Sequence, residues 1–493
     1  MAYEMTSRQT NLTLLSDFYE FTMAQAYFKQ GVHERTACFD LFFRQVPERG
    51  GYAIMAGVNQ MIEYIERLNF DPEIIAYLRQ EGFHEDFLDY LKNLDFKCDI
   101  EAVPEGTPIF PGEPIVKVKG PLLQCQLIET MLLLSINHQS LIATKSARIV
   151  RAAEGRPVME FGARRAQGYD ASLLGARAAY IAGVAGTSCT LAAQIFGMPA
   201  LGTMAHSWVQ SFPSEYEAFK AYAEVYPENT QLLIDTYNTL QSGIPNAIRV
   251  HREILEPQGH RLAGVRIDSG DLTYLSIKCR EALDAAGLED CKIIVSNSID
   301  EHLIRELLVQ GAKIDGFGVG ERLITSRAEP VFSGVYKLSA IENEAGELEP
   351  RMKISENPGK ITNPASKTVY RLYNEEGYAE ADLICLEEER PDLETSLEIF
   401  DPLHTWKRKT LNNFKARKLL EPIFKEGRRV YPEYSLEEIR KYARKEFGTL
   451  WDSIKRLENP QIYYVDLSQQ LWDLKDQILQ SYTRQDKRQG DNQ

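Results

Sequence analysis

Residues 263–271 read AGVRIDSGD, an apolar run that ends in a turn of charged and hydroxylated side chains. Similar runs recur in this part of the chain, as VMEFG at 158–162, ALGTMAH at 200–206, LLID at 232–235, IIVSN at 293–297 and IDGFGVG at 314–320. Such runs are typical of parallel strands that are buried on both faces. Their polar ends recur about every 20 to 33 positions, the length of one strand–helix unit. We therefore predict an α/β fold, an irregular α/β barrel with its chemistry at the strand ends.

The sequence on either side of these runs has a different character. Residues 15–28 have the apolar spacing of a helix, residues 36–43 alternate like a strand, and residues 99–119 predict short strands and turns. Beyond about residue 380 the chain is charged and helical in pattern, as in SLEEIRKYARKEF at 435–447, and the last ten residues look disordered. We predict an N-terminal α+β domain at 1–135 that later segments complete, an α/β barrel catalytic domain at 136–375, and a mostly helical C-terminal region with a disordered tail at 376–493.

Composition limits the kinds of partner that the chain can have. The chain has 56 basic and 71 acidic side chains, a net charge of −15, which disfavours nucleic acid in bulk and predicts no nucleic-acid partner. No segment approaches the roughly 18 apolar residues of a membrane span, and the N-terminus does not resemble a signal peptide. Seven scattered cysteines without a CxxC pair argue against a disulfide framework and a zinc site. We expect a cytoplasmic protein without membrane association, in which a few placed cations and backbone N–H groups bind any anionic ligand.

A histidine and an aspartate end two successive predicted strands. His206 closes ALGTMAH and Asp235 closes LLID. A histidine there can act as a base, a metal ligand or a phosphoryl acceptor, and an adjacent carboxylate would fix its tautomer and leave the other ring nitrogen nucleophilic. The alternatives are a structural histidine at a strand end and an aspartate that caps the next segment.

The segment RIDSGD at 266–271 concentrates charge at a third strand end. Carboxylates of the kind of Asp268 and Asp271 hold ribose hydroxyls or magnesium-bound pyrophosphate, while Arg266 can meet phosphate oxygens in a fork. The alternative is a polar turn before a capped helix. It is the weaker interpretation because an unpaired arginine inside an apolar run is costly.

Two further stretches suit anions. SNS at 296–298 and GFGVG at 316–320 follow the last two strong strands, where backbone N–H groups suit a phosphate, although GFGVG matches neither a dinucleotide fingerprint nor a Walker A sequence. Arg164 and Arg165 lie together after VMEFG. They can bind a carboxylate and a pyrophosphate, or they can be a solvated pair on a loop.

Taken together, these segments closely resemble the nicotinate phosphoribosyltransferase family, within the type II phosphoribosyltransferases. The resemblance runs in order from residue 14 to about 371, with a looser one in the C-terminal helices. It rests on LLSDFYEFTMAQAYF (14–28), IATKSARI (142–149), EFGARRAQGYDA (160–171), GTMAHSW (202–208), VRIDSGDL (265–272), SNSIDE (296–301), GFGVGERLITS (316–326), and VYKLSAI with MKISENPGKITNPASKTVYR (335–341 and 352–371).

The resemblance implies a role for each matching residue. His206 resembles the phosphorylated histidine and Asp235 its orienting carboxylate. The remaining implied contacts are with substrate: ribose and pyrophosphate at Arg266, Asp268 and Asp271; the 5-phosphate at Ser296, Asn297, Gly318 and Gly320; the pyridine ring stacked on Tyr19; the nicotinate carboxylate at Arg164 or Arg165; and added positive charge at Lys145 and Arg148.

The resemblance also implies an activity. It is the transfer of a phosphoribosyl group from phosphoribosyl pyrophosphate to nicotinate in NAD salvage, with ATP as co-substrate, Mg²⁺ as cofactor and a homodimer whose active sites are shared between subunits. The nearest alternative is a nicotinamide-specific enzyme. Glu160 is the carboxylate that would favour an amide, whereas the Arg164–Arg165 pair favours the nicotinate anion. A quinolinate enzyme would not need the histidine or ATP, and a non-catalytic pyridine-nucleotide-binding paralogue would have lost His206, Asp235 or RIDSGD.

Overall fold

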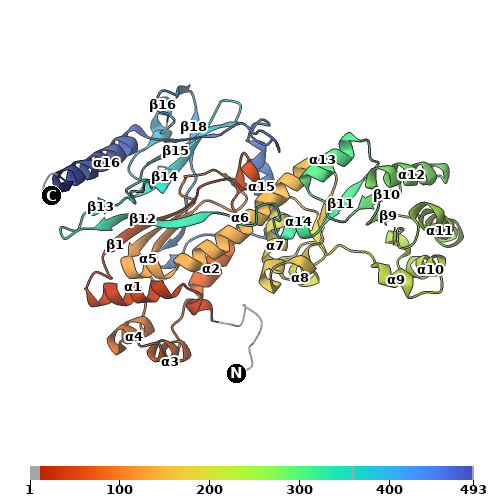
Figure 1. Ribbon diagram of the computed structural model, residues 1–493, viewed down its shortest axis with the longest axis horizontal. Coiled ribbons are helices and arrows are strands. Elements are labelled where there is room, and N and C mark those ends of the chain that lie inside the picture. The colour runs from red at the N-terminus through yellow and green to blue at the C-terminus, as the bar shows by residue number, and fades with distance from the viewer. Residues whose placement is uncertain (1–10, 358–359, 403, 491–493) are drawn as a thin grey trace. The chain divides into compact units, whose positions relative to one another are not determined.

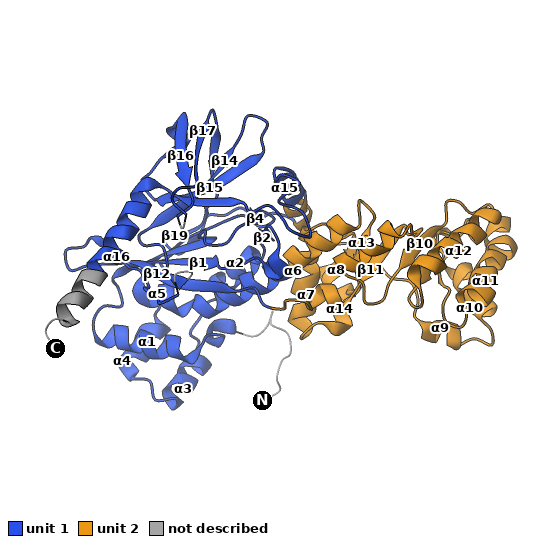
Figure 2. Cartoon of the chain, turned by 45° about the horizontal axis from the view of Figure 1, so that its top comes forward, with its two compact units in different colours: residues 1–141, 331–435, 441–493 blue, residues 142–330, 436–440 orange. Residues whose placement is uncertain are grey.

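The chain folds into two compact units in the computed structural model, which describes residues 11–357, 360–402 and 404–490. Unit 1 comprises residues 1–141, 331–435 and 441–493, and unit 2 comprises residues 142–330 and 436–440 (Figure 2). These limits differ from the predicted domain limits at 135 and 375. Residues 331–375 lie in unit 1 because strand β12 (Gly334–Glu342) pairs with strand β1 (Thr36–Phe43) over most of its length.

Unit 2 is built on a parallel sheet. Over the described residues the strand order is β7-β6-β11-β10-β9-β8, and every neighbouring pair is parallel. The strands are β6 (Val158–Glu160), β7 (Gly186–Thr187), β8 (Gln231–Leu233), β9 (Gly264–Ile267), β10 (Lys292–Val295) and β11 (Gly316–Val319). Five of the six predicted runs thus contain a strand. Within the described part of the chain β7 and β8 do not pair, so the α/β sheet is irregular and does not close into a full barrel.

Helices alternate with these strands, as Figure 1 shows. Apolar side chains from the strands, such as Val265, Ile293 and Phe317, are fully or almost fully buried under them. The helices are α7 (Tyr169–Ile181), α8 (Thr190–Phe196), α9 (His206–Gln210), α10 (Glu215–Val225), α11 (Ile244–Val250), α12 (Leu272–Ala285), α13 (Glu301–Val309) and α14 (Glu321–Ile324). The long helix α6 (Glu129–Ala152) begins in unit 1 and ends in unit 2.

The strand predicted at 200–206 was wrong. Ala200 forms a single parallel bridge with Thr187, and the chain then leaves the sheet. The reason is an arginine: Arg266 on β9 donates from Nη1 to Thr203 Oγ1 at 3.0 Å and from Nη2 to the carbonyl of Met204 at 2.9 Å. The Leu201 N–H still bonds to Thr187 on β7, but the Thr203 hydroxyl and the Met204 carbonyl meet a side chain instead of a neighbouring strand.

Unit 1 is built on sheets that are antiparallel except where β21 pairs with β15 in parallel. The largest, over the described residues, has the order β13-β12-β1-β5-β3-β19-β20, and its apolar face includes Phe39, Leu41, Val116 and Val118, all buried. The other sheets are β18-β14-β15-β21, β16-β17 and β2-β4. The strands are β2 (Ala53–Ile54), β3 (Asp99–Ala102), β4 (Pro108–Ile109), β5 (Val116–Pro121), β13 (Leu348–Pro350), β14 (Lys367–Tyr373), β15 (Ala379–Leu386), β16 (Ser396–Phe400), β17 (Arg408–Asn412), β18 (Lys415–Lys418), β19 (Glu421–Lys425), β20 (Arg428–Arg429) and β21 (Tyr464–Leu467).

The helices of unit 1 include α1 (Phe18–Lys29), close to the predicted span. Asp17 is its N-cap residue, but its side chain makes no capping bond among the described residues. The hydroxyl of Ser16 binds Glu20 and the carbonyl of Leu127. The others are α2 (Val58–Glu66), α3 (Pro72–Gln80), α4 (Glu85–Lys92), α5 (Leu122–Leu127) and α16 (Gln469–Gly490), while α15 (Leu436–Gly448) divides between the units at residue 440.

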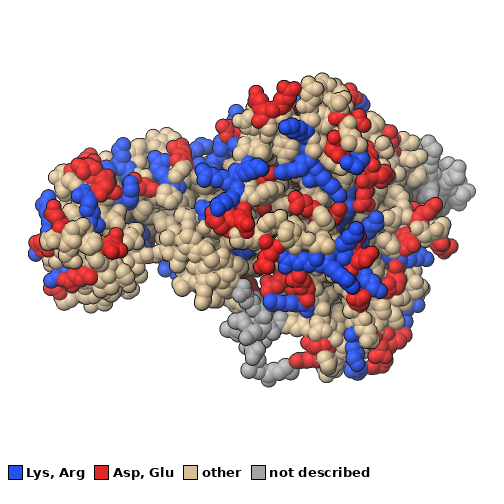
Figure 3. All heavy atoms as spheres, turned by 180° about the vertical axis from the view of Figure 1, so that it is seen from behind, with Lys and Arg blue, Asp and Glu red and all other residues tan. Residues whose placement is uncertain are grey.

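The prediction of a mostly helical C-terminal region was wrong. Helices α15 and α16 are present, but β15 to β21 also lie beyond residue 375 and extend the sheets of unit 1. The expected disordered tail is helical as far as Gly490, and residues 491–493 lie outside the described residues. Among the described helices, none has the length and apolarity that crossing a membrane requires. On the face drawn in Figure 3, basic and acidic side chains are interspersed, so the net charge does not gather there in one acidic field.

Candidate active site

His206 is the first residue of α9, at the end of the segment held by Arg266. Its two ring nitrogens have different neighbours. Nδ1 lies 3.0 Å from Thr236 Oγ1, a hydrogen-bond distance. Nε2 lies 3.8 Å from Asp268 Oδ2 and 4.0 Å from Asp235 Oδ1, too far for a hydrogen bond but close enough for charge to be felt. The ring therefore stands between a hydroxyl and two carboxylates, and it is partly open to solvent.

Asp235 follows β8, and its side chain is almost fully buried. One carboxylate oxygen, Oδ2, accepts from the backbone N–H of Asp268 at 2.9 Å and from the hydroxyl of Ser269 at 2.6 Å. The other oxygen, Oδ1, is buried, has no hydrogen-bond partner among the described residues and is the one nearest His206. An orphaned carboxylate oxygen is costly unless a cation or donor completes it, which marks this position as a site for one.

Arg266 lies on β9 with its side chain in the interior of the site. Burial lowers the pKa of its guanidinium, and its Nε is buried with no hydrogen-bond partner in the part of the chain that the structure describes. The nearby carboxylates of Asp268 and Asp235 oppose that pKa shift, whereas the charge of Arg164 adds to it. A buried guanidinium with a free donor is suited to an anionic ligand.

Ser296 and Asp268 meet across neighbouring strands. Ser296, after β10, donates its hydroxyl to Asp268 Oδ1, which leaves Oδ2 of that carboxylate facing His206. Asp271 is exposed, and its Oδ1 accepts from the N–H of Tyr274, so it caps α12. The two aspartates of RIDSGD therefore have different local roles.

The backbone after β10 is unusual. Asn297 and Ser298 have positive φ values of 88° and 47°, in the left-handed region that few non-glycine residues adopt. Consecutive residues in such conformations turn backbone N–H groups toward one side, an arrangement that suits anions. Packing explains why residue 318 is a glycine, because a Cβ there would lie 2.6 Å from the ring of Phe161. Gly320 is less restricted, with its nearest such contact at 3.1 Å.

Lys145 and Arg148 lie on the part of α6 that belongs to unit 2, and both bind one buried carboxylate. Glu301 Oε2 is 2.9 Å from Lys145 Nζ, and Oε1 is 2.8 Å from Arg148 Nε. Burial alone would raise the pKa of Glu301, but the two cations lower it to about 2. Both cations are thus engaged with Glu301, at the start of α13, and no described contact joins them to His206.

Arg164 and Arg165 lie in a short 3-10 turn after β6, and both are exposed. Glu160, on β6, is fully buried. It accepts from the backbone N–H of Gly162 and from Thr187 Oγ1, the latter at 2.6 Å, and burial raises its pKa. This carboxyl group is therefore committed to the backbone around β6 and β7.

Tyr19 lies on α1 in unit 1, and 45% of its surface is exposed. Partial burial and the neighbouring carboxylate of Glu129 raise the pKa of its hydroxyl. Much of the side chain is therefore accessible to a partner.

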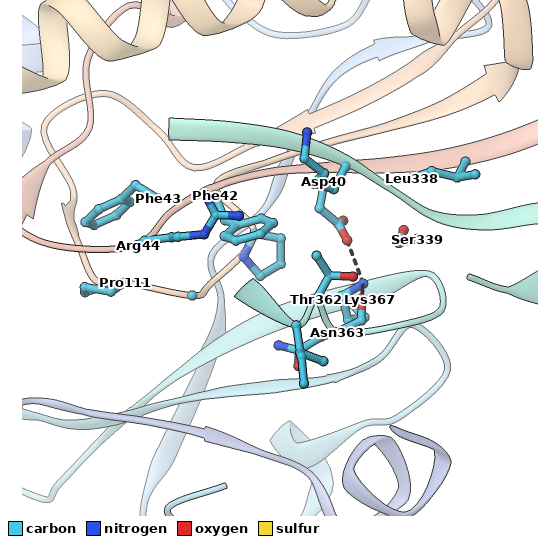
Figure 4. Close-up of a pocket in the computed structure, with 14 residues that line it drawn as sticks. Asp40, Phe42, Phe43, Arg44, Pro111, Leu338, Ser339, Thr362, Asn363 and Lys367 are labelled. Atoms are coloured by element: carbon cyan, nitrogen blue, oxygen red, sulfur yellow. Dashed lines mark hydrogen bonds and ion pairs between the residues drawn. The ribbon is translucent and has the colours of Figure 1, made fainter. Parts of the chain in front are cut away.

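A separate cavity of about 200 Å³ lies in unit 1 (Figure 4). Its lining includes Arg44, Lys337 and Lys367, with Lys367 held 2.6 Å from Asp40. Burial lowers the pKa of the Lys337 ammonium, and the charges of Lys353 and Arg44 add to that effect. None of the residues selected from the sequence lines this cavity.

The structure thus gathers Asp235, Asp268 and Ser296, which follow β8, β9 and β10, with Arg266 on β9 and His206 at the start of α9. Sequence reasoning missed Thr236, Ser269 and Thr203, which bind these side chains directly. These three could have been found in the sequence because each is a hydroxyl residue close to a selected one. Thr236 follows Asp235, Ser269 follows Asp268, and Thr203 lies three positions before His206. A partly exposed imidazole beside two carboxylates and a buried guanidinium can accept and pass on a phosphoryl group and bind a polyanion.

Comparison with known proteins identifies the family. Three family models match in order: the nicotinate phosphoribosyltransferase N-terminal domain at residues 14–137, the nicotinate phosphoribosyltransferase (NAPRTase) family at 157–376 and the C-terminal domain at 366–475. The nicotinate phosphoribosyltransferase of Bacillus subtilis is 44% identical over 96% of each chain. That of Homo sapiens is 33% identical over 93% of this chain and 95% of its own.

Solved structures agree. The crystal structure of human nicotinic acid phosphoribosyltransferase has a TM-score of 0.83 at 31% identity, over 94% of this chain and all of that one. A nicotinate-nucleotide pyrophosphorylase from Pyrococcus furiosus has a TM-score of 0.69 at 24% identity, over 91% of this chain and 98% of that one, and shares the fold. Sequence identity of 44% over nearly the full length of the Bacillus subtilis relative, together with the three family matches in order along the chain, shows that the chain belongs to the nicotinate phosphoribosyltransferase family.

Proposed function

We propose that this chain transfers the 5-phosphoribosyl group of phosphoribosyl pyrophosphate to nicotinate, forming nicotinate mononucleotide and pyrophosphate in NAD salvage. ATP is a co-substrate that phosphorylates His206 and yields ADP and phosphate. The observation that carries the proposal is the cluster of His206, at the start of α9, with Asp235 and Asp268, which follow the neighbouring strands β8 and β9, in a chain of this family.

The charges of the site support a polyanionic substrate. Departure of pyrophosphate leaves an oxocarbenium-like ribosyl centre, which the pyridine nitrogen attacks. The partly buried Arg266 supplies donors for the departing charge, and the Asn297–Ser298 turn supplies backbone N–H groups for the 5-phosphate. Hydrolysis of the phosphohistidine tightens substrate binding without making a bond to the product.

Magnesium fits the same cluster. Asp235 Oδ1, which is buried and unpartnered, and Asp268 Oδ2 both lie within 4.0 Å of His206 Nε2, and carboxylate oxygens are the ligands that Mg²⁺ prefers. These two carboxylates would hold the ion together with substrate phosphates. The ion supplies neutralisation of phosphate charge when bound.

The preference for nicotinate over nicotinamide follows from the base side of the site. Glu160 is the carboxylate that would favour an amide, but its oxygens are bound to Gly162 and Thr187. The charge of Arg164 contributes to lowering the pKa of Arg266, which indicates that Arg164 lies near the site. Arg164 is therefore the better candidate of the arginine pair for the nicotinate carboxylate.

We also propose a cytoplasmic homodimer with shared active sites. Helix α1 exposes Phe18 and Tyr19, and Leu134 is exposed on the adjoining start of α6, where Thr130 binds the backbone of Asp17. Such an apolar surface is typical of a subunit interface. The seven free cysteines support the cytoplasmic location.

The test is product formation by the purified chain. With phosphoribosyl pyrophosphate, Mg²⁺ and ATP, we expect nicotinate mononucleotide from nicotinate, at least tenfold slower turnover of nicotinamide, and a lower rate without ATP. Turnover of nicotinamide at the same or a higher efficiency would support the amide-specific alternative. No product from either base, with folded protein, would support a binding paralogue.

A further inference from the structure

The two nitrogens of the His206 ring are not equivalent in this site. Nδ1 is hydrogen-bonded to the Thr236 hydroxyl at 3.0 Å. Nε2 faces Asp235 and Asp268 at 4.0 and 3.8 Å, and within the described residues no group lies within hydrogen-bond distance of it. A neutral imidazole carries one proton, so the partner of one nitrogen decides which nitrogen keeps its lone pair.

We propose that Thr236 is a positioning residue that makes Nε2 of His206 the phosphoryl acceptor. Its hydroxyl oxygen accepts a hydrogen bond from Nδ1–H, which holds the proton on Nδ1 and leaves the Nε2 lone pair free. The proposal rests on the proposed function, because it names the atom through which His206 acts.

The position of Thr236 is fixed by its neighbours in the chain. Asp235, directly before it, is held by the N–H of Asp268 and the hydroxyl of Ser269. Asn238, two residues later, accepts from the N–H groups of Leu240 and Gln241. The hydroxyl of Thr236 is therefore presented by a segment that is anchored on both sides, which is what orienting a ring requires.

With Nε2 as the acceptor, the bonds and protons of the phosphoryl transfer are accounted for. The Nε2 lone pair forms the N–P bond while the bond from the γ-phosphorus to the β,γ-bridging oxygen breaks, and ADP leaves with that electron pair. No proton leaves Nε2, because it carries none. The ring becomes positive as it attacks, so its Nδ1–H donates more strongly to Thr236 in the transition state than before it. Loss of the hydroxyl should therefore slow phosphorylation more than it weakens ATP binding.

The test compares Thr236→Val, which keeps the shape and removes the hydroxyl, with Thr236→Ser, which keeps the hydroxyl. Thr273→Val is the matched control, since Thr273 binds Gln310 on the surface of unit 2. Each protein receives labelled ATP, and the rate of phosphohistidine formation and the phosphorylated nitrogen are measured. We expect Nε2-phosphohistidine in the wild type, a rate about 10- to 100-fold lower in Thr236→Val with KM for ATP little changed, and rates within about threefold of wild type in the other two.

A ¹⁵N NMR spectrum of the histidines without ATP tests the hydrogen bond independently of the reaction. We expect the Nδ1–H tautomer of His206 in the wild type and in Thr236→Ser, and a mixture in Thr236→Val. Phosphate on Nδ1, an Nε2–H tautomer in the wild type, or a wild-type rate in Thr236→Val would overturn the proposal. If the wild type takes up no label, the phosphohistidine of the proposed function is contradicted. The NMR measurement of the His206 tautomer then tests, by itself, whether Thr236 orients the ring.

Discussion

At the scale of single residues, the two carboxylate oxygens of Asp235 have separate roles. Oδ2 binds the N–H of Asp268 and the hydroxyl of Ser269, and so fixes the turn that follows β9. Oδ1 is buried, lacks a hydrogen-bond partner within the described residues and lies 4.0 Å from His206 Nε2. A substitution that preserves the first role and removes the second can separate structure from chemistry.

Asp235→Asn is that substitution. Its amide oxygen can replace Oδ2 as an acceptor, while a neutral NH₂ group replaces the charged Oδ1 that faces His206. We expect a melting temperature within a few degrees of wild type and phosphohistidine formation at least about 100-fold slower. Asp284→Asn on the surface of α12 is the control, with wild-type activity. Asp235→Asn with wild-type phosphorylation would show that Asp235 has only the structural role.

At the scale of elements, Glu301 links α13 to α6 through Lys145 and Arg148. Breaking a buried ion pair by removing one partner leaves the other charges poorly compensated. We expect Glu301→Gln to lower the free energy of unfolding by about 3 to 5 kcal/mol at pH 7. Glu306→Gln, on the exposed face of the same helix, should change it by less than about 0.5 kcal/mol. Urea unfolding checks both, and equal stabilities would contradict the role of this pair.

The same carboxylate predicts a pH dependence. Folding lowers the pKa of Glu301 from 4.5 to about 2. The stability that it contributes is therefore fully present above pH 4.5 and is lost as the pH falls toward 2. The stability of wild type should decrease more steeply than that of Glu301→Gln in this window. If the stabilities of the two proteins fell in parallel with pH, the pKa shift of Glu301 would not be the cause of the loss.

Glycine in β11 is required by packing. A Cβ at Gly318 would lie 2.6 Å from the Phe161 ring and 3.3 Å from Ser296 Cβ, whereas one at Gly202 would meet nothing within 4 Å. We expect Gly318→Ala to lower stability by about 1 to 3 kcal/mol and to reduce activity, because it displaces Ser296, and Gly202→Ala to leave stability nearly unchanged. Equal unfolding midpoints for the two variants would contradict the packing argument.

At the scale of the whole molecule, the sequence pattern predicted the parallel strands of unit 2 well. Buried parallel strands leave short apolar runs with polar ends, and five of the six predicted runs contain one. The failure at 200–206 has a long-range cause, since it depends on Arg266, some 60 positions away in the chain. The membership of β12 and β19 in the largest sheet of unit 1 likewise depends on pairing with β1 and β3, more than 290 positions away, which no local pattern contains.

The candidate site shows the same limit. Residue types at predicted strand ends selected His206, Asp235 and Asp268. The two aspartates meet because β8 and β9 are parallel neighbours, whereas His206 reaches them from the start of α9, after a segment that Arg266 binds. The sequence could not show that Lys145 and Arg148 would be bound by Glu301, nor that Thr236 would hold the ring, because both facts depend on side-chain distances.

The proposed homodimer predicts complementation. Tyr19→Ala and His206→Ala should each be inactive alone. If each site takes Tyr19 from one subunit and His206 from the other, mixed dimers have one intact site, and an equal mixture unfolded and refolded together should recover roughly a quarter of wild-type activity. Mixing without refolding is the control. No recovery, with heterodimers shown by mass spectrometry, would place both residues of a site in one subunit.

The most direct test of the central proposal is incubation with γ-labelled ATP, followed in parallel by the rate of nicotinate mononucleotide formation. The wild type should carry acid-labile label and form product faster with ATP. His206→Ala should carry no label and lose the stimulation by ATP, while His84→Ala, an exposed histidine of unit 1, should behave as wild type. Label that persists in His206→Ala, or ATP-stimulated product formation by that variant, would contradict the role of His206.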